Sequence, residues 1–556
     1  MESRTGEVAG AKESWVRPAS LRGLFALPLM VAITLGMASV GAAHVLAQGV
    51  PSAAAGPPGT GLAWGNNSDG ELGDGTTTDS STPIAVDLPA GTTITAIAAG
   101  TAYGLALTSA GTVLAWGDNS AGQLGDGTTT DSSTPVTVDL PAGTTITAVA
   151  AGDRHSLALT STGTMLAWGE NFIGQLGDGT TTRRSTPVAV DLPAGTTVTA
   201  VAAGDRHSLA LTSADTVLAW GDNSAGQLGD GTTTDSSTPV TVDLPAGTTI
   251  TTVAAGAYHS LAVTSADTML AWGYNIFGQL GDGTTTDRDT PVAVDLPAGT
   301  TITTVSGGAR HTLAVTSADT MLAWGHNNFG QLGDGTTTDR STPVAVNLPT
   351  GTTITTASAG AFHSLAVTST GTMLAWGYNA LGQVGDGTTA TRRRTPVAVD
   401  LPTGTTITAA AAGNRHSLAI APSTSTTTLQ VTPPNPTPDQ PITLTATVTC
   451  TASTPTGTVT FHDGTKTLDT EPLPASPTAI LRVTRLTPGT HRIHARYNGD
   501  SNCPSSTSNP TTVTVPKPTI PVTGTSLPTI LTAGSLLTLT GAALILAHRR
   551  RPAHGA

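Results

Sequence analysis

Short apolar runs alternate with turn-forming residues along most of the chain, and the whole pattern returns every 52 residues. Each repeat contains a tryptophan within a Leu-Ala-Trp-Gly phrase, at Trp64, Trp116, Trp168, Trp220, Trp272, Trp324 and Trp376. In one repeat, strand character is found at Val113–Gly117, Pro135–Leu140, Ile146–Ala151 and His155–Thr160, with Gly, Pro, Asn and Asp between the runs. The pattern therefore predicts a four-stranded β unit, without helices, that occurs seven times.

A four-stranded unit of this size cannot bury both of its faces alone, so we expect the units to pack around an axis as propeller blades. The fold class predicted is all-β, with a seven-bladed propeller at 59–422. The last unit ends at Pro422 without its own Leu-Ala-Trp-Gly strand, and one such strand precedes the first complete unit. We expect hydrogen bonds between Leu62–Trp64 and Ser417–Ile420 to close the ring and to cover two strand edges.

The N-terminal residues 1–47 predict export. Arg17 and Arg22 precede an apolar stretch and then small residues, as in a signal peptide that is cleaved after Ala47. An uncleaved membrane anchor is the alternative for this segment. In either case the propeller is expected outside the cytoplasm.

The C-terminal residues predict attachment to the cell envelope. A short motif in the linker at 517–526 precedes an apolar segment at 527–547 and a basic tail at 548–556; its residues are Ile520, Pro521, Val522, Thr523 and Gly524. This order resembles a sortase cell-wall sorting signal, whose motif begins with leucine where this chain has isoleucine. The resemblance implies cleavage between Thr523 and Gly524 and partnership with sortase and the cell wall. A plain transmembrane segment at 527–547 is the alternative.

A second module lies between the propeller and this anchor. After a Thr- and Pro-rich stretch at 423–441, interpreted as a linker and the start of the module, alternating apolar and polar residues predict a β-sandwich at 424–516. The phrases GTVTFHDG and PGTHRIHARYNGDSN resemble the bacterial immunoglobulin-like repeat, which implies the role of a stalk. The two cysteines of the chain, Cys450 and Cys503, both lie here, and export favours a disulfide over a metal site.

The repeat itself resembles a known family. The phrases WG.N..GQLGDGT and VAAG..HSLALT, separated by a proline, are similar to the regulator of chromosome condensation repeat in all seven copies from Gly59 to Pro422. The resemblance implies a seven-bladed propeller. It implies no single function, because members of that family include a nuclear nucleotide exchange factor, a plant photoreceptor and a secreted bacterial inhibitor of β-lactamases.

Charge restricts the partners of the propeller. Residues 59–422 contain 29 Asp and Glu against 11 Arg and no Lys, a net charge of −18. Such a surface repels phosphate backbones, so no nucleic-acid partner is expected.

The repeated polar residues are interpreted as structural. Tyr103 stands at one position of the first unit, and the other six units have a histidine there. These histidines are His155, His207, His259, His311, His363 and His416. Side chains distributed around a ring do not converge on one ion or one substrate, so no catalytic residue, metal site or cofactor is predicted. The aspartates of the Leu-Gly-Asp-Gly-Thr phrases, from Asp74 to Asp386, are interpreted as turn residues, with calcium binding as the alternative.

The positions that vary between units are the candidates for binding. The variable residues at the start of each His-Ser strand define a candidate binding face at Tyr103, Arg154, Arg206, Tyr258, Arg310, Phe362 and Arg415. A second variable set comprises Phe172-Ile173, Ile276-Phe277, Phe329 and Leu381, and a third comprises Arg183-Arg184, Arg288, Arg340 and Arg392 to Arg394. Arg, Tyr and Phe suit interface anchors. Neutral drift among exposed turns is the alternative.

The sequence therefore favours a non-enzymatic binding or adhesion protein, anchored at a bacterial cell surface, whose partner is an unknown protein or glycan. A secreted propeller that inhibits an enzyme is the first alternative, and the low aromatic content of 3% counts against it. Nucleotide exchange activity is the second alternative and rests on the resemblance alone.

Overall fold

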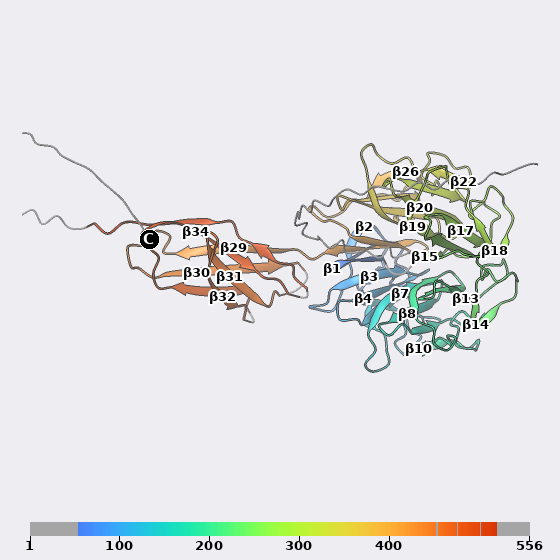
Figure 1. Ribbon diagram of the computed structural model, residues 1–556, viewed down its shortest axis with the longest axis horizontal. Coiled ribbons are helices and arrows are strands. Elements are labelled where there is room, and N and C mark those ends of the chain that lie inside the picture. The colour runs from blue at the N-terminus through green and yellow to red at the C-terminus, as the bar shows by residue number, and fades with distance from the viewer. Residues whose placement is uncertain (1–53, 452–453, 475, 501, 520–556) are drawn as a thin grey trace, which may run out of the picture. The chain divides into compact units, whose positions relative to one another are not determined.

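The computed structural model describes residues 54–451, 454–474, 476–500 and 502–519. Strands are the regular elements within these ranges, and they build a propeller and a smaller β-sandwich (Figure 1). The all-β class predicted from the sequence is confirmed. The predicted leader at 1–47, the motif Ile520–Gly524 and the apolar segment at 527–547 lie outside the described residues. Within the described ranges, no helix has the length and apolar character needed to cross a bilayer.

The inner half of each blade is a pair of antiparallel strands. The innermost strands are β3 (Ile94–Ala99), β7 (Ile146–Ala151), β11 (Val198–Ala203), β15 (Ile250–Ala255), β19 (Ile302–Gly307), β23 (Ile354–Ala359) and β27 (Ala409–Ala412). The second strands are β4 (Tyr103–Thr108), β8 (His155–Thr160), β12 (His207–Thr212), β16 (His259–Thr264), β20 (His311–Thr316), β24 (His363–Thr368) and β28 (His416–Pro422). We number the blades one to seven in this order.

The outer half of each blade begins with the tryptophan strand. The third strands are β5 (Val113–Gly117), β9 (Met165–Gly169), β13 (Val217–Gly221), β17 (Met269–Gly273), β21 (Met321–Gly325), β25 (Met373–Tyr378) and, in blade seven, β1 (Ala54–Gly65). The outermost strands are β6 (Ser132–Thr137), β10 (Arg184–Ala189), β14 (Ser236–Thr241), β18 (Arg288–Ala293), β22 (Arg340–Ala345), β26 (Arg392–Ala398) and, in blade seven, β2 (Ser80–Ala85). The predicted strand at Pro135–Leu140 is therefore placed too late, because the ladder already begins where Ser132 pairs with Gly117.

The ring closes as the sequence predicts. In blade seven, β1 pairs with β28 from Gly59 opposite Pro422 to Gly65 opposite His416, so residues from both ends of the propeller share one sheet. The start of β1 also pairs with β3 of blade one, where Gly59 lies opposite Ile94. Since β1 has a hydrogen-bonded neighbour on each side, neither it nor β28 presents an open edge.

Every blade contacts the next through one buried carbonyl. The backbone oxygen of Gln123 accepts hydrogen bonds from the indole Nε1 of Trp168 at 2.8 Å and from the Ser156 hydroxyl at 2.9 Å, both in the following blade. The imidazole Nε2 of His155 lies 3.0 Å from the Ser208 hydroxyl one blade further on. A side chain at Gly152 would place its Cβ 2.3 Å from that imidazole, so glycine is required for this approach. The repeated Trp, Ser and His residues therefore have the packing role expected of them.

Blade one departs from this pattern. Tyr103 replaces histidine, and its hydroxyl donates to the backbone oxygen of His155 at 2.6 Å and lies 3.1 Å from the Ser156 hydroxyl. Gly104 replaces the serine, and a Cβ there would lie 2.7 Å from the ring of Trp116. The hydroxyl that would face His416 is consequently missing at the junction between blades seven and one.

The second module is a sandwich of two sheets. One sheet contains β29 (Ser425–Thr432), β30 (Ile442–Cys450) and β33 (Thr478–Val483); the other contains β31 (Thr458–Asp463), β32 (Lys466–Pro472), β34 (Gly489–Tyr497), β35 (Ser506–Thr507) and β36 (Thr511–Val515). Leu444, Phe461 and Ile493 lie in its buried core. Cys450 and Cys503 form a disulfide with a Cα–Cα distance of 5.9 Å, as predicted. Within the stretch predicted as a linker and the start of the module, the alternating Thr-rich residues Ser425–Thr432 form β29, which pairs with β30.

The closure of the ring leads to a first prediction. Deleting residues 58–66 removes Leu62 and Trp64 from the apolar core that they share with blade six, and removes the pairing with β28. Loss of a buried tryptophan alone costs about 3–5 kcal/mol, so we expect the melting temperature to fall by on the order of 10 °C. The measurement is calorimetry against a chain that begins at residue 54. Equal melting temperatures would exclude a stabilising role for the closure.

The buried histidines lead to a second prediction, on acid stability. Burial lowers the pKa of His155, His259, His311 and His363 to about 3 and that of His207 and His416 to about 4. Below pH 6.5 the unfolded chain therefore binds more protons than the folded chain, so the free energy of unfolding decreases as the pH is lowered. With each histidine contributing about 1 kcal/mol at pH 5.5, we expect a melting temperature lower by on the order of 10 °C than at pH 7.5.

The check is calorimetry across this pH range for the native chain and for His207→Gln, which keeps a polar side chain but does not titrate. The variant should lose less stability on acidification. Burial raises the pKa of Asp205 to about 7, which has the opposite effect on the slope, but it is one group against six. A melting temperature that is constant from pH 7.5 to 5.5 would show that the histidines are not neutral in the fold.

Candidate binding face

Each blade brings three variable loop positions to the same edge of the ring. The start of the second strand lies beside the end of the third, as His259 does beside Gly273. The residue before the second strand, the residue after the third-strand glycine and the residue before the Gly-Gln pair therefore lie on one side of the propeller. We call this side the variable face.

Blades four to six carry a continuous cluster of aromatic side chains on the variable face. This cluster, the aromatic patch, consists of Tyr258, Tyr274, Phe277, His326, Phe329, Phe362 and Tyr378. Their rings meet edge to face, with centroid distances of 6.2 Å for Tyr258–Tyr274, 6.5 Å for Tyr274–Phe277, 4.7 Å for Phe277–His326, 6.2 Å for His326–Phe362, 5.4 Å for Phe329–Phe362 and 4.9 Å for Phe329–Tyr378. Such pairs add stabilisation beyond the burial of their area.

The contacts between blades in the patch follow one rule. The residue before the Gly-Gln pair of one blade packs against the next blade, as Phe277 does against His326 and Phe329 against Phe362. The guanidinium of Arg310 lies 5.1 Å from the centroid of Phe277, within the range of a cation–π interaction. Except for the buried His326, the rings are half-buried, and Ile276 beside them is 50% exposed. The patch is therefore an apolar surface that is partly exposed to solvent and whose side chains are held by contacts with one another.

In the remaining blades the residue after the third-strand glycine is polar, at Asn66, Asp118, Glu170 and Asp222, and three of the four residues before the second strand are arginines. Arg154 approaches Asp118 with an N–O distance of 4.0 Å, and Arg206 and Arg415 are exposed. Phe172 of blade two is 61% exposed and lies under the guanidinium of Arg183, at 5.4 Å. It makes no ring contact with the aromatic patch among the described residues. The variable face is therefore divided into an aromatic part and a charged part.

Six of the seven residues predicted from the sequence as a binding face lie on the variable face, and the seventh, Tyr103, does not. Arg154, Arg206, Tyr258, Arg310, Phe362 and Arg415 lie in equivalent loops on the variable face. Tyr103 does not, because it occupies the buried histidine position and its side chain is 0% exposed. Ala102 takes the loop position in blade one. The prediction failed at Tyr103 because sequence alone did not show that its hydroxyl replaces the imidazole in the junction between blades.

Sequence reasoning missed three members of the patch, Tyr274, His326 and Tyr378. They follow the Trp-Gly of blades four, five and six, where the other blades have Asn66, Asp118, Glu170 and Asp222. The signal was present as a change from polar to aromatic residues at one repeat position. The sequence did not show that the loop after Trp-Gly lies beside the loop before the second strand, so this change could not be linked to the predicted face.

Four arginines of the third variable set form ion pairs with aspartates of their own blade. The guanidinium groups of Arg184 and Arg288 bind the carboxylates of Asp178 and Asp282 at 2.8 Å, and Arg340 and Arg393 form the equivalent pairs with Asp334 and Asp386. Burial alone would raise the pKa of Asp178, but hydrogen bonds from Thr180, Arg184 and Asn171 hold it below its usual value.

The aspartates of these turns also accept hydrogen bonds within their own loop. Asp178 Oδ1 accepts from Asn171 at 3.1 Å and from the Thr180 hydroxyl at 2.7 Å, which stabilises the turn, as the sequence predicted. Within the described residues, no group of three or more His, Cys, Asp or Glu side chains is arranged to hold a metal ion.

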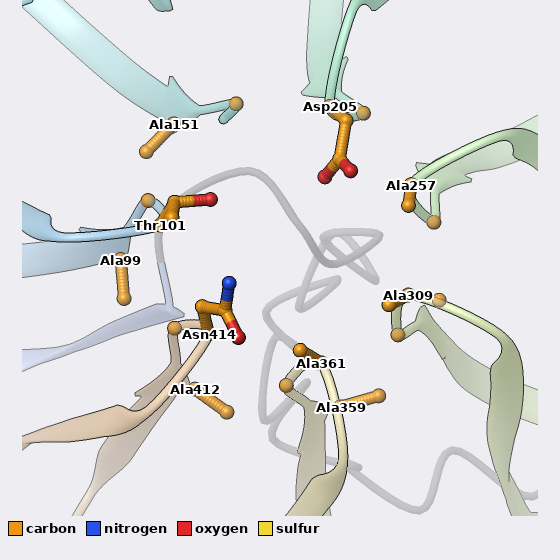
Figure 2. Close-up of a pocket in the computed structure, with 18 of the residues that line it drawn as sticks. Ala99, Thr101, Ala151, Asp205, Ala257, Ala309, Ala359, Ala361, Ala412 and Asn414 are labelled. Atoms are coloured by element: carbon orange, nitrogen blue, oxygen red, sulfur yellow. The ribbon is translucent and has the colours of Figure 1, made fainter. Parts of the chain in front are cut away.

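A cavity of about 370 Å³ lies on the propeller axis and is lined by the ends of the innermost strands and the loops that follow them. Tyr258, Arg310 and Phe362 contribute to its lining, so it adjoins the aromatic patch. Figure 2 shows that small alanine side chains cover much of the wall, whereas Thr101, Asp205 and Asn414 point inward. Burial raises the pKa of Asp205 to about 7; the neighbouring Asp153 adds to the shift, while Arg206 and Arg310 oppose it.

Comparison with known proteins places both modules. The RCC1-like domain model matches residues 60–419, and the model of the bacterial Ig-like domain (group 3) matches residues 429–516. The ultraviolet-B receptor UVR8 of Arabidopsis thaliana is 34% identical over 330 residues, which cover 59% of this chain and 75% of the receptor. The E3 ubiquitin-protein ligase HERC2 of Homo sapiens is 35% identical over 275 residues, 49% of this chain but 6% of the ligase.

Solved structures agree with the propeller fold. Yeast Prp20p matches with a TM-score of 0.59 and 25% identity over 66% of this chain and 93% of that chain. Human WBSCR16 matches with the same TM-score and 23% identity over 65% of this chain and 98% of that chain. Since the closed seven-bladed ring agrees with a family match over 60–419, this chain belongs to the RCC1-like domain family.

Proposed function

We propose that the chain is a non-enzymatic binding protein whose propeller captures a protein partner through the aromatic patch. The observation that carries the proposal is the concentration of aromatic side chains at this site. The chain has only five Tyr and six Phe, yet three of each lie in the patch on blades four to six. Low aromatic content therefore does not count against a tight protein interface.

The physical properties of the patch suit a protein partner. Tyr, Phe and Arg side chains are enriched among residues that contribute most to binding, and they act best when surrounded by groups that exclude water. Here the rings are held by one another and by Arg310, so little side-chain entropy is lost on binding. The charged part of the face, with Arg154, Asp118 and Arg206, supplies both signs for orientation.

Display at a bacterial cell surface is the second part of the proposal. The leader-like residues 1–47 and the apolar segment at 527–547 favour export followed by anchoring. The Cys450–Cys503 disulfide is compatible with an oxidising compartment. The match to a bacterial Ig-like domain favours a stalk that carries the propeller.

Two other functions have less support. A secreted inhibitor would use the same aromatic patch but would not keep an envelope anchor. Nucleotide exchange, or a role in ubiquitin ligation, would be transferred from relatives by fold, and the match to HERC2 covers only 6% of that ligase.

Substitution within the patch provides a third prediction. In capture from the envelope fraction of the producing bacterium, Phe329→Ala and Tyr274→Ala should each reduce recovery of at least one protein tenfold or more, since loss of an anchor costs over about 1.4 kcal/mol. Quantitative mass spectrometry of the bound proteins is the measurement.

Phe172→Ala is the matched control, because Phe172 is an exposed aromatic residue outside the patch. It should leave recovery of the same protein unchanged, and all variants should keep the native melting temperature within a few degrees. If every bound protein is recovered equally by the patch variants and the control, the patch is not the binding site.

Anchoring provides a fourth prediction. Protease treatment of intact cells should release propeller peptides from residues 59–422, and mass spectrometry of the mature chain should find a C-terminus at Thr523 if sortase acts. A surface-exposed chain that retains Arg549–Arg551 would replace wall coupling by a membrane anchor. An intact chain that begins at Met1 and is found only in the cytosol would exclude display altogether.

A further inference from the structure

The axial cavity has two chemically different halves. The residue after each innermost-strand glycine lies at the cavity, and around the ring these residues are Thr101, Asp153, Asp205, Ala257, Ala309, Ala361 and Asn414. The four polar residues come from blades seven, one, two and three, which are consecutive. The three alanines come from blades four, five and six, which also carry the aromatic patch.

The polar half offers hydrogen-bond acceptors from several blades. Figure 2 shows the carboxylate of Asp205, the amide of Asn414 and the hydroxyl of Thr101 pointing into the cavity. The Oδ1 atom of Asn414 is buried and accepts no hydrogen bond from the described residues. A buried acceptor without a donor is costly, so a ligand that donates to this oxygen would be stabilised by it. Asp153, which also lines the cavity, adds negative charge.

The backbone amides on the cavity wall do not supply the missing donor, because they already donate to carbonyls of the next blade. The amide of Asp153 donates to the carbonyl of Asp205 at 3.2 Å, and the amide of Asp205 donates to the carbonyl of Ala257 at 3.1 Å. The amide of Ala361 likewise donates to the carbonyl of Gly413 at 3.2 Å. The Oδ1 atom of Asn414 is therefore left for a donor on a ligand.

We propose that the axial cavity binds a primary ammonium group on an apolar stem, the chemistry of a lysine side chain, presented by the partner that docks on the aromatic patch. The ammonium has three donors and no acceptor, which matches the acceptors of Asp205, Asn414 and Thr101. The stem lies against Ala257, Ala309 and Ala361. A hydrated metal ion would leave this apolar half unused. Only the identity of the presenting partner depends on the proposed function; the cavity itself does not.

The ligand adds a positive charge beside Asp205. Asp205 and Asp153 repel each other, and the cations near Asp205 are Arg206 and Arg310. An ammonium beside Asp205 neutralises this repulsion and favours the ionised carboxylate. Because the pKa of Asp205 is about 7 in the unliganded protein, binding displaces a proton near neutral pH and strengthens as pH rises.

The fifth prediction uses pentylammonium chloride as the probe and titration calorimetry on the full chain. We expect a Kd on the order of 1 mM, which suits so small a ligand. The affinity should rise about tenfold from pH 6 to pH 8, as Asp205 ionises. Pentanol, which has the same stem without the charge, should not bind measurably.

Asp205→Asn and Ala309→Leu test the two halves of the site. The first removes the charge and the second fills the apolar half, and each should weaken binding tenfold or more. Asp205→Asn should also abolish the pH dependence, which a merely structural effect would not do. Asp215→Asn, in the exposed hairpin of the same blade, is the matched control and should bind as the native chain does.

Failure of pentylammonium to bind the native chain, equal binding by Asp205→Asn, or a flat pH profile would each overturn the proposal. The assay contains no partner, so its outcome is separate from the capture experiment. Binding of the amine together with unaffected capture by patch variants would retain the cavity site and discard the docking patch. Loss of capture without amine binding would do the reverse.

Discussion

The structure depends on one buried carbonyl at each junction between blades. The backbone oxygen at this point accepts the indole of the next tryptophan and, except between blades seven and one, a hydroxyl of the next blade, as the oxygen of Gln123 does for Trp168 and Ser156. Both donors are buried, so an unpaired group at any junction would be costly. The closing strand carries the same interaction, because Trp64 donates to the oxygen of Gln383 at 2.9 Å. Closure of the ring is therefore another copy of the blade junction, formed by residues 319 positions apart.

This constraint explains why the variable positions gather where they do. The tryptophan, serine, histidine and glycine of each repeat are used in packing, which leaves the loops at the edge of the ring free to differ. In each blade two adjacent loop residues then determine the lining of the axial cavity and the composition of the variable face around it. In blades four, five and six these pairs are Ala257-Tyr258, Ala309-Arg310 and Ala361-Phe362, so one residue makes the cavity wall apolar and the next supplies the patch or its cation.

The division of the face also bears on function. A propeller that served only as a spacer would have no need to hold its few Tyr and Phe rings together across three blades, since isolated apolar residues are tolerated on any surface. The rings of Phe277, Phe329 and Phe362 instead connect separate blades. An acidic, amphipathic cavity beside such a surface allows binding to depend on both the charge and the shape of a partner.

The sequence by itself determined the repeat, the strand-forming runs, the seven blades, the clasp and the pairing of Cys450 with Cys503. The repeat and the blades follow from the fixed period and the alternating residues, the clasp from the incomplete first and last units, and the disulfide from the presence of only two cysteines in the chain. Tertiary structure alone decided which variable loops become neighbours, as with Tyr274 and Tyr258. It also decided that Tyr103 is buried and that Asp205 faces a cavity. Such outcomes depend on contacts between residues one or more repeats apart, and no local pattern contains that information.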